Sequence, residues 1–254
     1  MSGESAADPR AHQEATGPAA EPAGTFLGHP KALSFLFATE MWERFSFYGM
    51  RALLVLYMVH YLLKPGMAET VLGYDLLRRG LEFVFGPLGV QPMASEIYGL
   101  YAGFVYLTPI FGGLLADRVL GQRRTVVIGA LLMAAGHFMM AVEPLFLFAL
   151  LTLILGNGAF KPNISTQVGR LYAPGDARRD RAYSIFYVGI NIGAFLAPLV
   201  CGTLGEEAGW RFGFGAAGVG MLISTAIYLY ALRLPPDDRP RRRGAAPRRK
   251  LDPA

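Results

Sequence analysis

Six segments of this chain are long and apolar, and short polar or basic stretches separate them. They cover about residues 32–63, 96–116, 125–142, 145–169, 183–204 and 212–232. Their lengths are close to the roughly 20 residues that an α-helix needs to cross about 30 Å of hydrocarbon. Because lipid offers no partner to an unpaired backbone group, and barrel strands would be shorter and alternate in polarity, the pattern predicts an all-α membrane protein with a six-transmembrane-helix bundle.

The remaining stretches divide the chain into three regions. Residues 1–30 are polar and lack the apolar core of a signal peptide, so a disordered cytoplasmic tail is expected. Residues 31–232 hold the bundle and include a long outer loop, 64–95, whose centre LLRRGLEFVFG can form a short amphipathic helix on the bilayer surface. Residues 233–254 are expected to be a basic cytoplasmic linker or tail.

Composition agrees with a membrane protein and excludes several other classes. Apolar residues make up 53% of the 254 residues and charged residues only 17%, with a mean hydropathy of +0.34, whereas soluble domains carry about 25% charged residues. The single cysteine, Cys201, excludes an intrachain disulfide and a multi-cysteine metal cluster. The sequence contains no HExxH, CxxC, P-loop or nucleophile–base constellation, so neither catalytic residues, a metal nor ATP-driven transport is expected.

The basic residues give the orientation. If the N-terminus is cytoplasmic, 17 of the 24 Lys and Arg residues lie in cytoplasmic segments and 4 lie outside. Short cytoplasmic loops attract such an excess, so an N-in, C-in topology is expected. This excess of basic residues in cytoplasmic segments also explains the net charge of +5. Nucleic acid is not an expected partner, because the basic tail has no interleaved aromatic residues that could stack on bases.

The first apolar segment carries charges where charges are costly. An ionised side chain in the bilayer core costs at least about 2.5–3.5 kcal/mol, yet this segment contains Glu40, Glu43, Arg44 and Arg51. Helical spacing places them, with Tyr48, within an arc of about 140°. The pattern predicts a polar cavity in which carboxylates exchange protons, and the alternative is an ion-pair cluster that only fixes helix packing.

A third intramembrane cation lies in the segment 145–169. Two acids balance Arg44 and Arg51, so Lys161 leaves a surplus positive charge suited to an anionic group such as a carboxylate. Arg51 could bind that group through two parallel hydrogen bonds, and Lys161 would act as a point charge. Pro162 removes the hydrogen bond to the carbonyl of Gly158, which predicts a bend there or, alternatively, a simple packing kink.

Other polar residues in the spans are weaker candidates. Tyr106 and Asn191 could line the cavity, although each could equally form an interhelical hydrogen bond. His60 and His137 are expected to be hydrogen-bonded residues near the membrane interface, and not members of a proton relay.

Four motifs resemble those of one family, the proton-dependent oligopeptide transporters of the major facilitator superfamily. EMWERFSFYGMR at 40–51 resembles the ExxER signature of helix 1, and GNGAFKPNIS at 156–165 and FYVGINIG at 186–193 resemble the signatures of helices 4 and 5. GLLADRVLGQRR at 113–124 resembles the loop motif of the whole superfamily. The matches run in order from about residue 29 to 205.

The resemblance implies a role for each matching residue. Proton coupling is implied for Glu40, Glu43 and Arg44, and binding of the peptide for Arg51, Lys161, Tyr48, Tyr106 and Asn191. A gating loop is implied for Gly113, Asp117, Arg118, Gly121 and Arg123. Two positions depart from the family: Phe47 replaces the first tyrosine of a Tyr-Tyr pair, and Gly99 replaces the helix 2 histidine of animal members.

The same resemblance implies what the chain does and what it lacks. The family folds as two six-helix halves, so this chain resembles the N-terminal half, not competent without a C-terminal half. The implied function is proton-coupled symport of di- and tripeptides across the cell membrane, bacterial inner or equivalent, driven by the proton gradient without a cofactor. The alternatives are a symporter of nitrate, a modified amino acid or a peptide-like drug, and a non-transporting half-bundle that acts as a membrane interaction partner.

Overall fold

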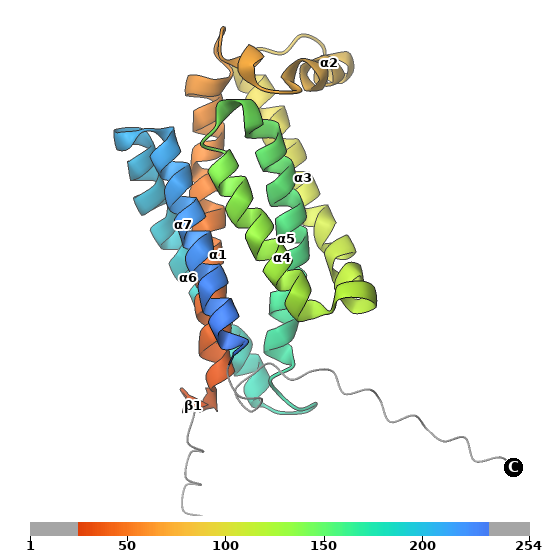
Figure 1. The fold of residues 1–254 in the computed structure, drawn as a ribbon, viewed down its shortest axis with the longest axis vertical. Coiled ribbons are helices and arrows are strands. Elements are labelled where there is room, and N and C mark those ends of the chain that lie inside the picture. The colour runs from red at the N-terminus through yellow and green to blue at the C-terminus, as the bar shows by residue number, and fades with distance from the viewer. Residues whose placement is uncertain (1–24, 234–254) are drawn as a thin grey trace, which may run out of the picture.

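The computed structural model describes residues 25–233, and its main feature is a bundle of six long helices (Figure 1). These are α1 (Lys31–Tyr57), α3 (Val90–Leu115), α4 (Gln122–Met139), α5 (Phe146–Gly169), α6 (Arg178–Ala197) and α7 (Trp210–Ala231). Stretches of π-helix extend three of them: η2 (Met58–Leu62) follows α1, η4 (Ala116–Leu120) follows α3, and η6 (Pro198–Gly202) and η7 (Leu204–Ala208) follow α6. The start of α1 and the end of α7 lie at the same end of the bundle, as an even number of crossings requires.

Five of these helices, with their extensions, are long and apolar enough to cross a membrane. The spans are Lys31–Leu62, Val90–Leu120, Glu143–Gly169, Arg178–Ala208 and Trp210–Ala231. The sixth helix, α4, falls short because Gln122, Arg123 and Arg124 lie in its first turn. The all-α membrane bundle is therefore confirmed. The boundaries differ most at α3, which begins at Val90 and not near residue 96, so that the outer loop is shorter than expected.

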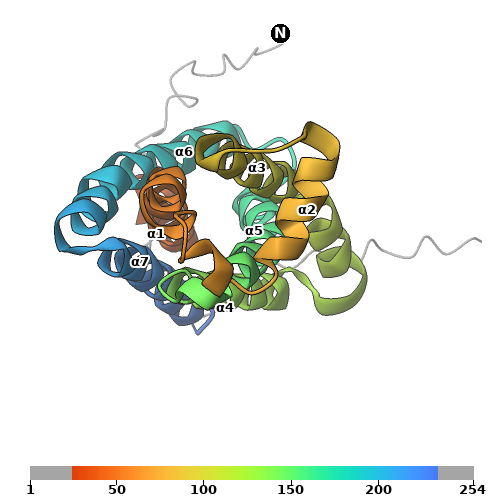
Figure 2. The same cartoon turned by 90° about the horizontal axis from the view of Figure 1, so that it is seen from above.

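The outer loop contains a short helix in the expected place. A 3₁₀ turn, η3 (Ala68–Thr70), precedes α2 (Tyr74–Phe85), which lies across the end of the bundle (Figures 1 and 2). Gly73 and Gly86, with φ of 83° and 81°, bound α2 in a backbone conformation that favours glycine. Leu76, Phe83 and Val84 are largely exposed, Phe83 at 91%. An apolar exposed face of this kind favours the predicted position at the bilayer surface.

The segment before α1 is folded from residue 25 onward. Strands β1 (Thr25–Phe26) and β2 (His29–Pro30) form an antiparallel hairpin. His29 is buried, and its Nδ1 lies 2.8 Å from the hydroxyl of Tyr172. Burial, then the charges of Arg178 and Arg181, lower the pKa of His29, which favours the neutral ring. The predicted tail thus ends earlier than residue 30, and its residues 1–24, like linker residues 234–254, lie outside the described residues.

The six helices form two similar groups of three. Helix α1 packs between α6 and α7, and α5 packs between α3 and α4 (Figure 2). Contact between α4 and α7 joins the groups, whereas α1 meets α3 and α5 only sparsely. The helices that carry most of the predicted site, α1 and α5, are therefore the central member of each group.

Glycine allows the helix backbones to approach closely within each group. A Cβ atom at Gly112 of α3 would lie 1.9 Å from the carbonyl oxygen of Gly158 on α5. In the other group, a Cβ atom at Gly193 of α6 would lie 2.2 Å from the carbonyl oxygen of Met41 on α1. Because apolar burial contributes little between helices in lipid, such close packing stabilises the bundle.

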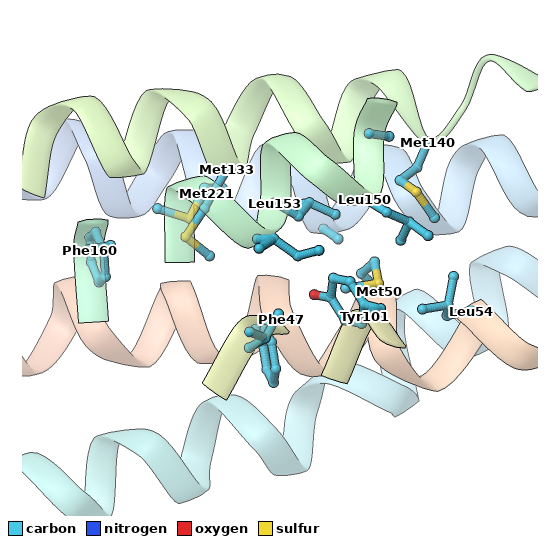
Figure 3. Close-up of a cluster of buried hydrophobic side chains, with 14 of the residues drawn as sticks. Phe47, Met50, Leu54, Tyr101, Met133, Met140, Leu150, Leu153, Phe160 and Met221 are labelled. Carbon is cyan, nitrogen blue, oxygen red and sulfur yellow. The ribbon is translucent and has the colours of Figure 1, made fainter. Parts of the chain in front are cut away.

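The space between the groups is filled, and two outer faces are not covered. Figure 3 shows side chains from both groups meeting there, among them Met50 of α1, Met133 of α4, Leu153 of α5 and Met221 of α7. The bundle is therefore packed and not a pore. In contrast, α3 and α6 bury little of their apolar surface. Their exposed residues include Phe104, Leu107, Phe111, Phe195, Leu196 and Leu199.

Candidate functional site

The three charged residues at the start of the first motif form one buried cluster, called here the α1 triad. Glu40, Glu43 and Arg44 are only 2%, 0% and 3% exposed. Arg44 donates to both oxygens of Glu43, from Nε to Oε2 and from Nη2 to Oε1 at 2.7 Å. Its Nε also lies 3.2 Å from Oε1 of Glu40. One guanidinium therefore holds two carboxylates away from water.

The α1 triad has one carboxylate more than it has cations. Oε2 of Glu40 is buried and has no hydrogen-bond partner among the described residues. Lys161 acts on both glutamates by its charge, but forms no ion pair with either within residues 25–233. The two acids and two arginines, which balance in formal charge, therefore do not pair one to one, because both glutamates bind Arg44 and Arg51 does not join the cluster. A buried carboxylate oxygen without a partner is a place where a proton can bind.

Neighbouring helices hold the triad in place. Ser46 donates to the carbonyl of Ala217 on α7 at 2.5 Å, and Ser224 of α7 donates to the carbonyl of Thr39 at 2.7 Å. The Arg44 guanidinium lies 5.0 Å from the ring centroid of Phe47. Phe47, the residue that departs from the family pattern, thus covers the triad with an aromatic face.

Arg51, on the same helix, lies in a different environment. It is half-buried and borders a cavity of about 350 Å³ with Tyr48, Ala52, Tyr98 and other residues of α1, α3 and α6. Its Nε donates to the hydroxyl of Tyr98, and its guanidinium carbon lies 5.6 Å from the centroid of that ring. Arg51 and Tyr48 thus border one cavity, and Glu43 is not among the residues that line it.

The other predicted substrate-binding residues are more scattered. The Lys161 ammonium lies 5.4 Å from the ring centroid of Tyr106, which is 66% exposed, so the two form a cation–π pair between α5 and α3. Asn191 is also exposed, but its amide donates to the carbonyl of Tyr187 on its own helix at 2.9 Å. The structure therefore places Lys161 with Tyr106 and leaves Asn191 separate.

Pro162 does not end α5, which continues to Gly169. The carbonyl that the proline leaves without its helical partner, that of Gly158, packs against Gly112 of α3. One residue further on, Asn163 donates to the carbonyls of Ala159 at 2.7 Å and Gly112 at 3.3 Å. The polar groups around the proline are thus used in the contact between α3 and α5.

The predicted gating loop lies at the opposite end of the bundle from α2 (Figure 1). Asp117 and Arg118 are exposed on η4, and Gly121 turns the chain into α4 with φ of 76°. A polar cavity of about 320 Å³ includes Gly113, Asp117 and Arg170 among its lining residues. Arg123 follows in the first turn of α4 and takes part in further interactions.

Sequence reasoning missed several polar residues that are buried or half-buried. Tyr98 carries no motif that would connect it with Arg51. Gln167 of α5 and Tyr228 of α7 form a buried hydrogen-bonded pair at 2.8 Å that spacing alone could not reveal. His137 is fully buried in the last turn of α4 and neither ring nitrogen has a partner among the described residues, so the expected hydrogen bonding of this histidine is wrong. Asn157 is likewise buried without a partner in the described part of the chain.

Comparisons with known proteins agree with the motifs. The model of the POT family matches residues 123–244. A peptide transporter of Yersinia enterocolitica is 47% identical over 210 residues, which are 80% of this chain and 37% of that protein. A di-/tripeptide transporter of Lactococcus lactis is 42% identical over 81% of this chain and 38% of its own length. The chain therefore spans less than two-fifths of these relatives.

Solved structures show the same fold. A peptide transporter POT in complex with sulfate matches with a TM-score of 0.68 and 44% identity, over 82% of this chain and 39% of the other. A POT family transporter in complex with a thioalcohol-conjugated peptide matches with a TM-score of 0.68 and 35% identity, over 84% and 40%. The family model, the relatives and the solved structures therefore agree: residues 123–244 match the POT family, and the described bundle has the fold of the N-terminal part of POT transporters.

Proposed function

We propose that this chain is the N-terminal half of a proton-coupled symporter that carries di- and tripeptides across the cell membrane. The observation that carries the proposal is the division of charge along α1. One site is dry and holds an unpaired carboxylate oxygen, and the other borders a cavity and holds an arginine without a carboxylate partner in the described chain. Proton-coupled uptake of a peptide needs these two kinds of site close together.

In this proposal the proton binds at Glu40. Glu43 uses both oxygens to accept hydrogen bonds from Arg44, and these bonds favour its ionised form. Oε2 of Glu40 has no such donor in the described chain, and a proton there removes the uncompensated charge of the α1 triad. Protonation also weakens the attraction of Glu40 for Arg44 and Lys161, which leaves Lys161 freer to interact with substrate.

The peptide carboxylate binds at Arg51. The cavity beside Arg51 supplies the phenol of Tyr48, and the Lys161–Tyr106 pair supplies a second cation for the same class of substrate. The proton gradient supplies the energy, and no cofactor is required. Solved relatives of this family contain sulfate, alafosfalin and a conjugated peptide, and anionic groups of this kind are what an arginine binds well.

A second six-helix half would complete the transporter. The exposed apolar faces of α3 and α6 offer it a surface, and the Arg51 cavity reaches the same two helices through Tyr98 and Ala194. Alternating access requires two such bundles to move around one site. The gating loop with Asp117 and Arg118 would then meet the second half at the cytoplasmic end.

The test is uptake of a labelled dipeptide by proteoliposomes under an inward proton gradient. The chain continued by the sequence that follows it in its gene should accumulate the dipeptide, and the 254-residue chain alone should not. Glu40→Gln should abolish gradient-driven accumulation while exchange of dipeptide across the membrane persists. Glu206→Gln, an exposed carboxylate on η7, is the matched control and should transport normally. Full gradient-driven uptake by Glu40→Gln would refute the proton site.

One finding favours a different solute within the same family. A POT family transporter with 35% identity to this chain has been solved with 5-aminolevulinic acid, which also carries a carboxylate. Competition separates the two substrates. If 5-aminolevulinic acid displaces the dipeptide at lower concentration than other dipeptides do, the substrate class is amino acids and not peptides. If the continued chain transports neither, a non-transporting role as an interaction partner gains support.

A further inference from the structure

Tyr98 has no role in the motifs, yet it makes the one side-chain hydrogen bond that Arg51 forms within residues 25–233. Arg51 extends from α1 across to α3, where its Nε donates to the Tyr98 hydroxyl. Its guanidinium carbon also lies 5.6 Å from the centroid of the Tyr98 ring. Both residues are half-buried, and both line the cavity of about 350 Å³.

The way in which the two arginines of α1 use their donors differs. Arg44 uses Nε for both glutamates and Nη2 for Glu43, so its bonding is directed inward to the triad. Arg51 uses only Nε, and its Nη1 and Nη2 groups donate to no acceptor in the described part of the chain. No carboxylate there lies within ion-pair distance of Arg51 either.

The geometry of a guanidinium makes this arrangement selective. Its five N–H donors lie in one plane, and either the Nη1/Nη2 edge or the Nε/Nη2 edge can bind the two oxygens of a carboxylate. When Tyr98 occupies Nε, only the Nη1/Nη2 edge remains for bidentate binding. The ring contact also limits rotation of a long side chain that would otherwise lose entropy on binding.

We infer that Tyr98 is a positioning residue that holds Arg51 by its Nε and thereby presents the terminal edge of the guanidinium to the carboxylate of the substrate. The positioning itself stands on the two contacts between Tyr98 and Arg51. The identification of the bound group rests on the proposed function. A purely structural tyrosine would satisfy a buried charge, whereas Tyr98 holds a cation that borders an open cavity and has no counter-ion in the described chain.

The positioning is tested first without transport, on the 254-residue chain in detergent micelles. Tyr98→Phe removes the hydroxyl and keeps the ring. The ¹⁵Nε–¹Hε signal of Arg51, assigned with Arg51→Lys, should move in Tyr98→Phe, and its hydrogen should exchange with water at least about tenfold faster because the acceptor is lost. The control is Tyr230→Phe, an exposed tyrosine of α7 that packs on Phe35, which should leave the signal unchanged. An Arg51 signal that does not respond to Tyr98→Phe overturns the inference.

Transport then tests what the positioning is for. In the complete transporter, Tyr98→Phe should raise KM for a dipeptide about five- to tenfold, the worth of one ordinary hydrogen bond, with the maximal rate changed less than about twofold. The inhibition constant of the corresponding dipeptide amide, which has no carboxylate, should stay the same. Equal weakening of both ligands would show a general packing role and overturn the inference. Absence of transport by the unsubstituted protein would instead overturn the proposed function, while the Arg51 signal still decides the positioning.

Discussion

Arg44 and Arg51 lie on one helix, about two turns apart, and they occupy opposite kinds of environment. Arg44 is 3% exposed and binds two glutamates. Arg51 is half-buried, borders a cavity and donates a hydrogen bond to one tyrosine, Tyr98. Helix α6 accounts for much of the difference. At Gly193 it touches the backbone of α1 beside Arg44, whereas the next residue, Ala194, helps with Pro198 of η6 to line the cavity beside Arg51.

This difference shows how one helix can hold a proton site and a binding site without merging them. Where α6 and α7 close on α1, water is excluded, and a carboxylate must find a cation or a proton. Where α3 and α6 leave space, a guanidinium can keep its charge available to a ligand. The proton site at Glu40 therefore depends on tight helix packing, whereas the binding site at Arg51 depends on looser packing that leaves a cavity.

The largest effect is expected when the triad loses its cation. Arg44→Met leaves Glu40 and Glu43 buried without a counter-ion and should lower the free energy of unfolding by about 3–5 kcal/mol. Arg51→Met should cost less than about 1 kcal/mol, because its charge is partly hydrated. Denaturant titration of the chain in micelles measures both. Adding Glu40→Gln and Glu43→Gln to Arg44→Met should restore most of the loss, and equal losses at the two arginines would contradict the comparison.

The two glutamates of the triad should respond unequally. Glu43→Gln replaces an oxygen that accepts from Arg44 by an amide donor and should cost about 2–3 kcal/mol, the value of a hydrogen bond to a charged group. Glu40→Gln can turn its amide carbonyl toward Arg44 and its NH₂ to the unpartnered side, so it should cost less than about 1 kcal/mol. Denaturant titration of both variants in micelles measures the two losses of stability. If Glu40→Gln proves the more costly change, the proton has been assigned to the wrong residue.

The fold was predictable from the sequence because membrane spans are long and apolar. Six segments and the short helix within LLRRGLEFVFG appear where they were expected. The start of α3 at Val90 was missed, because the residues before 96 include Gln91 and Ser95, whose polarity marks the membrane boundary but does not end a helix. Residues 25–30 form a hairpin that composition could not indicate, since it depends on burial of His29 against Tyr172.

The candidate site was predictable only along one helix. Spacing correctly brings Glu40, Glu43 and Arg44 together, because neighbours on one helix face are fixed by helical geometry. The same spacing wrongly placed Arg51 in this cluster, because its hydrogen-bond partner, Tyr98, lies on another helix, α3. Contacts between helices, such as Arg51 with Tyr98, depend on which faces meet, and the sequence alone does not determine this.

A smaller effect tests the packing behind the triad. At Gly193 an added Cβ atom would lie 2.2 Å from the carbonyl oxygen of Met41 and 2.9 Å from the nitrogen of Phe45. Gly193→Ala should therefore separate α6 from α1 and cost about 1–3 kcal/mol. Gly99 on α3 has open space around it, so Gly99→Ala should be neutral or stabilise by up to about 1 kcal/mol through helix propensity. Gly193→Ala should also let water reach the triad. A cysteine introduced by Thr39→Cys should then react faster with a polar thiol reagent than it does in the presence of Gly193.

The smallest effect concerns an ion pair at the end of a span, between Arg178, the first residue of α6, and Asp176, which precedes the helix, where water screens the charges. Arg178 donates to both oxygens of Asp176 at 3.1 and 2.9 Å, a geometry like that of Arg44 with Glu43 but exposed. This bonding lowers the pKa of Asp176 from 3.8 to about 2. Its contribution to stability is therefore present above pH 4 and disappears as the pH falls toward 2. Asp176→Asn should lower the melting temperature less than any destabilising change above, and the difference should shrink with salt and with acid. The loss of stability in Arg44→Met should not depend on salt. If Asp176→Asn lowers stability by a similar amount, and salt does not change that amount either, burial does not distinguish the two ion pairs.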